Sequence, residues 1–288
     1  MVLESLIDPW SAKKNPLLLF LIGLLFSSVA VLFGIWIFKA QASLVMVFLT
    51  VIVAVPLMYA TMEEEEELDW KGDGELGILE QHGKAITFFT MMFLGFVVGY
   101  TLWYAFLPPE MLESVFNSQI GTIKAINGNM FTVSGVAYAS HIDSLVAIFA
   151  NNVKVLIFCV FFAFFFGAGA IFILAWNASV IAAAAGTYFR NAIAGLADVA
   201  GLNLAANYFH FFVAGIMKYM THGVFEIIAY FIGGLAGGII SVALVHHNPR
   251  SPEFKKVWYD ALVLILFAVV FLAVGSVVEV YVTSMFFE

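Results

Sequence analysis

The sequence has very few charged residues and a single cysteine. Of its 288 residues, 11% are charged, 63% are hydrophobic and 31 are phenylalanine. Soluble domains carry about 25% charged residues, so this composition excludes a soluble domain and predicts an integral membrane protein. The lone Cys159, in the stretch FCVFFAFFF, excludes an intrachain disulfide and a thiolate cluster, and we expect it to serve packing.

Motifs for catalysis and nucleotide binding are also missing. The sequence contains no HExxH, no GxSxG, no P-loop and no GxGxxG. We therefore predict that the protein is not an enzyme, with no catalytic residue and no cofactor, while metal binding stays open. The net charge is -8 and no basic stripe is present, which argues against a nucleic-acid partner.

Long apolar runs dominate what is present. Crossing the hydrocarbon takes about 20 apolar residues, and the backbone in lipid must bond internally, so such runs predict α-helices. We predict an all-α polytopic membrane protein with about 6–7 transmembrane helices, in which Pro16 begins the first helix and Pro108 ends the third. The predicted segments are about 16–38, 43–61, 85–107, 153–176, 202–220, 222–245 and 260–283.

These segments divide the chain into four parts. They are a two-helix hairpin (1–61), an acidic cytoplasmic loop (62–84), a membrane core (85–245) that includes an extracytoplasmic loop (108–152), and a cytoplasmic loop with a last helix (246–288). A cytoplasmic N-terminus places eight basic residues inside and four outside, which predicts this orientation, with the C-terminus outside the plasma membrane. The inside set is Lys13, Lys14, Lys71, Lys84, Arg190, Arg250, Lys255 and Lys256; the outside set is Lys39, Lys124, Lys154 and Lys218.

One stretch is too long for one span and too short for two comfortable ones. Residues 153–189 carry a single charge, Lys154. Because Asn favours helix N-caps, we predict a break after Trp176, at Asn177. The half-helix at 178–189 would either line an ion or substrate site or lie at the interface and cover the bundle.

Two loops carry further signals. The run Glu63–Glu67 predicts a solvated acidic face, with cation binding as the minor alternative. The stretch IGTIKAINGNMFTVSG alternates and contains Asn127-Gly128, which predicts a small extracytoplasmic β-hairpin. Such a hairpin would pack on the membrane surface or on a partner.

Ionisable residues inside the apolar segments are the candidate site. His222 and Glu226 share a helical face, and Lys218 and Glu279 fall at a similar depth. The four would either hold the bundle together or bind an ion or proton. Asn152 and Asn177 are interpreted as helix caps first and as polar lining second. His210 is expected to make a buried hydrogen bond.

Glycines in two segments are interpreted as helix-packing residues. The stretch FIGGLAGG places them four residues apart, which allows close helix approach, either within one chain or between two copies. We expect a homodimer. The predicted packing residues are Gly223, Gly233, Gly234, Gly237, Gly238, Gly167 and Gly169.

Two of these stretches resemble a known family. The family is the stage II sporulation protein M family, also called the DUF95 family. Its asparagine-led helix is similar to NNVKVLIFCVFFAFFFGAGAIFILAWNASVIAAAAG, and its HGxxE helix is similar to THGVFEIIAYFIGGLAGG. The sequence looks more like the archaeal members of the family than the bacterial ones. The resemblance covers residues 85–245. In spore-forming bacteria, proteins of this family anchor a peptidoglycan-degrading complex and are not themselves the hydrolase. The resemblance therefore implies a non-enzymatic anchoring protein. The positions that match are Asn152, Asn177, His222, Gly223 and Glu226.

Two functions follow from these observations. In the first, the protein is a membrane scaffold that recruits membrane or extracytoplasmic partners through residues 108–152. In the second, it is an ion or small-solute transporter or channel that uses His222 and Glu226. The residue types alone do not decide between them.

Overall fold

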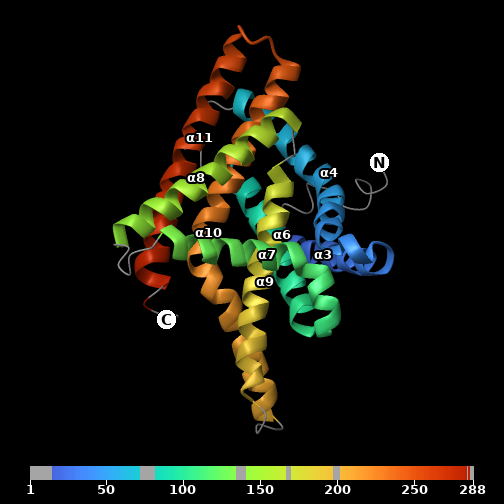
Figure 1. The fold of residues 1–288 in the computed structure, drawn as a ribbon. Helices are drawn as coiled ribbons and strands as arrows, with labels where there is room; N and C mark the ends of the chain where they lie inside the picture. The colour runs from blue at the N-terminus through green and yellow to red at the C-terminus, as the bar shows by residue number, and fades with distance from the viewer. Residues whose placement is uncertain are drawn as a thin grey trace.

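The computed structural model describes residues 15–71, 82–133, 141–166, 170–196, 202–283 and 285. Within these residues the fold is helical and contains no strand (Figure 1). Seven helices, all except α7, are long and apolar enough to cross a membrane, which confirms an all-α multi-pass protein. The helices are α3 (Pro16–Ile37), α4 (Ala42–Lys71), α6 (Gly83–Phe106), α7 (Pro109–Val133), α8 (His141–Phe166), α9 (Ala170–Ala194), α10 (Leu202–His246) and α11 (Pro252–Val277).

The predicted β-hairpin is wrong. Residues 109–133 form α7, and Asn127-Gly128 lies inside this helix. The helix is interrupted only at Phe116, whose backbone is non-helical (φ -121°, ψ 17°) and whose buried ring meets Tyr104 edge-on with 4.9 Å between centroids. Beyond Phe116, α7 runs crosswise to α10 in Figure 1. The helix is favoured because its buried residues recur at helical spacing, which outweighs the local turn signal.

The predicted break after Trp176 is also wrong. Helix α9 is continuous across this position, and the Asn177 side chain donates to the Ile173 carbonyl at 2.8 Å instead of capping a helix. Helix α8 is described to Phe166 and α9 from Ala170, and the predicted packing residues Gly167 and Gly169 lie outside the described residues. No half-helix exists at 178–189, because α9 is a full membrane-length helix.

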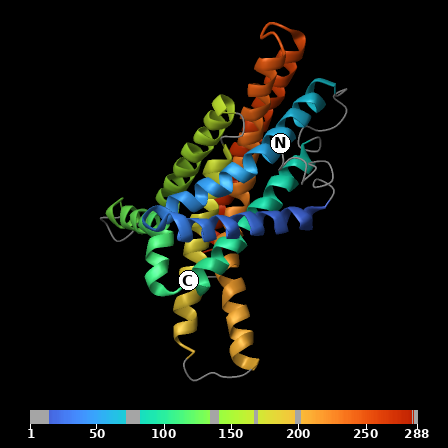
Figure 2. The same cartoon turned by 90° about the vertical axis from the view of Figure 1, so that its right-hand side faces the viewer.

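Helix α10 joins two segments that the sequence predicts as separate spans. It contains 45 residues, so it is roughly 67 Å long, about twice the hydrocarbon thickness. In Figures 1 and 2 it pairs with α9 at one end of the molecule and with α11 at the other. The polar pair Thr221-His222 does not end the helix. The Thr221 hydroxyl donates to the Met217 carbonyl of its own helix at 2.7 Å, and His222 has a partner outside α10, Thr283.

Helix ends are capped by side chains. The Asn15 side chain accepts from the Leu18 backbone N–H at 3.3 Å, and Pro16 occupies the first turn of α3 as predicted. At the end of α6, Arg190 of α9 donates to three backbone carbonyls, and the shortest bond, 2.8 Å, goes to Leu107. The Arg190 guanidinium therefore satisfies carbonyls that have no partner within α6 and ties α9 to its end.

Helices α3 and α6 approach at backbone contact. A Cβ added at Gly23 would overlap the Met92 carbonyl, and one added at Gly95 would overlap the Phe20 carbonyl and lie 2.8 Å from the Leu24 nitrogen. In Figure 2, α3 runs crosswise to α10, so this contact holds the first helix against the bundle at a steep angle. Small residues permit such close crossings in membrane helices.

The glycine ridge of α10 packs inside the chain. Its four glycines face three helices, because an added Cβ at each would meet α8, α9 or α4. At Gly237 that atom would lie 2.5 Å from the Val160 carbonyl, and at Gly234 it would lie 2.9 Å from Ala170 Cβ. Gly233 and Gly238 abut Leu156 and Met62, respectively. All ten residues from 231 to 240 are buried, so this part of α10 is the centre of the core.

Candidate functional site

The candidate site is a row of polar side chains on one face of α10. His222, Glu226 and Tyr230 follow one another at four-residue spacing, which places them on that face. The face looks toward α8 and toward the end of α11, where the helix changes into one π-helical stretch, η2 (Val278–Thr283). Such π segments often mark functional positions.

Asn152 of α8 connects Tyr230 to Glu226. Its amide Nδ2 donates to Glu226 Oε1 at 2.5 Å, and its Oδ1 accepts from the Tyr230 hydroxyl at 3.1 Å. Asn152 is 6% exposed and Tyr230 2% exposed, so both are shielded from lipid and water. Asn152 lies inside α8 and is therefore a lining residue, not the helix cap that its type predicts.

Glu279 of η2 is the second carboxylic acid of the cluster. Its carboxyl group hydrogen-bonds the carboxyl group of Glu226. Because ionised carboxylates only accept hydrogen bonds, a bond between the two requires a proton on one of them. Gly275, one turn before Glu279, packs closely on α10, since a Cβ there would lie 3.2 Å from Phe225 Cβ and 3.4 Å from Glu226 Cγ.

His222 has a different partner from the one its spacing predicts. Its Nδ1 lies 3.1 Å from the Thr283 hydroxyl, one turn beyond Glu279. His222 and Glu226 therefore each bond η2 through their own partner. We name Asn152, His222, Glu226, Tyr230, Glu279 and Thr283 the intramembrane cluster.

The structure places the remaining predicted residues elsewhere. Lys218 Nζ lies over the Tyr188 ring of α9, 5.7 Å from its centroid. Asn177 bonds its own helix, and His210 is exposed on α10 instead of buried. A Cβ added at Gly223 would meet no atom within 4 Å, so this glycine is not required for packing.

Tyr230 and Thr283 belong to the cluster but are not predicted as site residues. A tyrosine or threonine in an apolar segment is common, so its type alone gives no signal. Tyr230 lies four residues after Glu226, and Thr283 lies four residues after Glu279. Searching four residues from each carboxylate of the predicted site would therefore have identified both.

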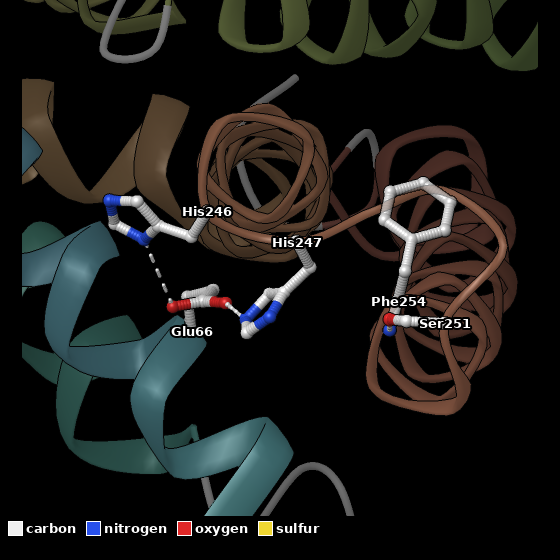
Figure 3. Close-up of polar contacts among 5 residues, drawn as sticks. All are labelled: Glu66, His246, His247, Ser251 and Phe254. Atoms are coloured by element: carbon white, nitrogen blue, oxygen red, sulfur yellow. Dashed lines mark hydrogen bonds and ion pairs between the residues drawn. The ribbon is translucent and has the colours of Figure 1, made fainter.

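A second polar group lies at the end of α4 and is also missing from the predicted site. Two residues of the acidic run, Glu65 and Glu66, are each 1% exposed, so the prediction of a solvated face does not hold for them. Glu65 Oε2 lies 2.7 Å from Nδ1 of His82, just before α6. Glu66 Oε1 lies 2.7 Å from His247 Nε2, at the end of α10 (Figure 3).

The site chemistry is that of hydrogen bonding and proton sharing. Among the described residues, no group of three or more His, Cys, Asp or Glu side chains is arranged to hold a metal ion. The intramembrane cluster offers two carboxyl groups, one carboxamide, one imidazole and two hydroxyls, all drawn from α8, α10 and η2.

Seven membrane-length helices, with a polar cluster between α8, α10 and η2, define a multi-pass helical membrane protein. Residues 85–284 match the family described as stage II sporulation protein M, and the chain belongs to this family. The match extends past residue 245 and includes Glu279, while α3 and α4 precede it. No curated protein and no solved structure matches the chain.

Proposed function

We propose that the protein is a non-enzymatic membrane scaffold that recruits partners at the plasma membrane. One observation carries the proposal: the polar groups of the intramembrane cluster bond one another across three helical elements. Asn152 bonds both Tyr230 and Glu226, and Glu226 bonds Glu279. These hydrogen bonds hold α8, α10 and η2 together. A transport path between these elements would require them to separate, so the bonds support a rigid scaffold.

The partner-binding surface in this proposal is α7 with the first turns of α8. On α7, Val115, Phe116 and Gln119 are buried against the bundle, whereas Glu113 and Asn117 are exposed. An amphipathic helix lying crosswise at one end of the bundle offers partners a polar face on a rigid support. In this proposal the N-terminus is cytoplasmic, which puts α7 outside the membrane. With α9 and α10 as continuous spans, Arg190 also falls outside, so the excess of basic residues on the cytoplasmic side becomes smaller.

The expected homodimer needs a face other than the glycine ridge, because that ridge packs within the chain. Helix α8 offers such a face, with the exposed residues Phe158, Phe161 and Phe165 along one side. Chemical cross-linking in native membranes tests for this dimer.

Site-specific photo-cross-linking tests recruitment. A photoreactive residue at Asn117 is expected to capture discrete protein partners in native membranes, whereas one at the exposed Leu266 of α11 is expected to capture lipid. Equal patterns of captured protein at both positions would contradict recruitment through α7.

A second candidate function, proton or cation transport, is favoured by the two hydrogen-bonded carboxyl groups within the bundle. Ion flux into proteoliposomes, measured at several pH values for the native chain and for Glu226→Gln, separates the two functions. The scaffold predicts no flux from either protein. Flux that is present in the native chain and absent from the variant would replace the scaffold with a transporter.

A further inference from the structure

The buried carboxylate of Glu66 faces two histidines at the end of α10. Glu66 Oε1 lies 2.7 Å from His247 Nε2, and Oε2 lies 3.7 Å from His246 Nδ1. Figure 3 shows the carboxylate between the two rings, one on each side. The Glu66 side chain is 2% exposed, whereas the His247 and His246 side chains are 18% and 48% exposed. Protons from water therefore reach the histidines directly, while the carboxylate is shielded.

The neighbouring elements add charged groups to both sides of this contact. On α4, Glu65 precedes Glu66 and pairs with His82, which leads into α6. On α11, Glu253 in the first turn acts electrostatically on His247, and Lys256 and Asp260 follow along the same helix. His247 thus interacts with carboxylates from two different helices, Glu66 of α4 and Glu253 of α11.

We propose that Glu66, His246 and His247 form a proton-operated latch that holds the end of α4 to the end of α10. While at least one of the two histidines is protonated, the ionised Glu66 has a positive partner. When both histidines are neutral, the buried Glu66 carboxylate no longer has a positive partner. A buried charge without compensation favours a rearrangement that exposes it to water. Histidine is the side chain suited to this role near neutral pH.

The latch goes beyond the proposed scaffold because it makes the arrangement of helices at this end depend on pH. Residues 72–81 connect α4 to α6 and lie outside the described residues. The polar contacts that join the end of α4 to other helices include those of Glu65 with His82 and of Glu66 with the histidines of α10, so release of Glu66 removes one of the contacts that hold this end.

Distance measurements between spin labels test the latch in the full chain. Labels on Tyr59→Cys and Val245→Cys occupy exposed positions on α4 and α10, and Cys159→Ala removes the native thiol. In the native background, raising the pH from about 6 to about 8.5 is expected to lengthen and broaden the distance distribution. An unchanged distribution across this range would overturn the proposal.

Matched variants assign the response. The double variant His246→Asn with His247→Gln keeps neutral donors near Nδ1 and Nε2 but does not titrate, so its distribution should be the same at both pH values. Glu66→Gln should also lose the response. His210→Gln changes an exposed histidine of the same helix and should respond as the native chain does. A native pH response in the double histidine variant would refute the latch, even if Glu66→Gln failed to fold.

Discussion

At the scale of single residues, Asn152 is the best-connected side chain of the intramembrane cluster. Its amide nitrogen donates a hydrogen bond to Glu226, and its amide oxygen accepts one from Tyr230. Removing Asn152 leaves the buried Tyr230 hydroxyl and the half-buried Glu226 carboxyl group without that partner. Removing the tyrosine hydroxyl leaves only one lone pair of the Asn152 carboxamide oxygen unoccupied. The two losses should therefore differ in size.

We expect Asn152→Ala to lower the free energy of unfolding by about 1–3 kcal/mol and Tyr230→Phe by about 0.6 kcal/mol. Unfolding in mixed detergent micelles, followed by circular dichroism, measures both. A Tyr230→Phe variant as destabilised as Asn152→Ala would show that Asn152 does not carry the connection.

The pairing of these residues also shows what single-sequence reasoning misses. His222 and Glu226 are predicted as a pair from their spacing, and the structure gives each a partner on η2. Spacing along a helix shows which side chains share a face, but it does not show which residue of a distant element lies opposite. Depth along the last predicted span places Glu279 in the candidate site, whereas Thr283 follows after an entire further helix and no pattern local to His222 contains it.

At the scale of elements, apolar length predicts the spans well because hydropathy is a local property. The errors come from signals that tertiary packing overrides. The sequence predicts two spans, 202–220 and 222–245, yet α10 continues through residue 221, where Thr221 bonds its own helix and His222 bonds Thr283. Asn127-Gly128 is interpreted as a hairpin turn, yet the preceding turns of α7 bury one side against the bundle and the helix continues past them.

Glycines give a test at this scale, because their roles in packing differ sharply. Gly95→Ala places a Cβ against the backbone of α3 and should destabilise the protein by about 1–3 kcal/mol. Gly223→Ala meets no atom within 4 Å and should be neutral or stabilising by about 0.5–1 kcal/mol. Thermal unfolding of the two variants in one detergent measures the difference. Equal effects would mean that α3 and α6 are not in backbone contact.

At the scale of the whole molecule, continuous α9 and α10 change the predicted topology. The sequence predicts Arg190 and Arg250 on the same, cytoplasmic side of the membrane. A single α10 is expected to place its two ends on opposite sides of the membrane, because a continuous helix crosses the bilayer once. The linker after α9 and the linker after α10 must then face different compartments.

Cysteine accessibility distinguishes these topologies. In a Cys159→Ala background, Gly195→Cys lies just after α9 and Asn248→Cys just after α10, both at exposed positions. In intact cells, a membrane-impermeant maleimide is expected to label Gly195→Cys and not Asn248→Cys, and both should react after permeabilisation. Labelling of both, or of neither, in intact cells would restore the topology in which α10 is two spans.

The order of the chain has a consequence for how the protein is made. Asn152 precedes Glu226, whereas Glu279 and Thr283 follow it after the whole of α11. During synthesis, Glu226 therefore enters the membrane with Asn152 already in place, and the second carboxyl group arrives later. A ribosome stalled before α11 would leave a nascent bundle whose buried acid has one of its two partners, and this unfinished intermediate is the form in which quality-control proteases should find it most easily.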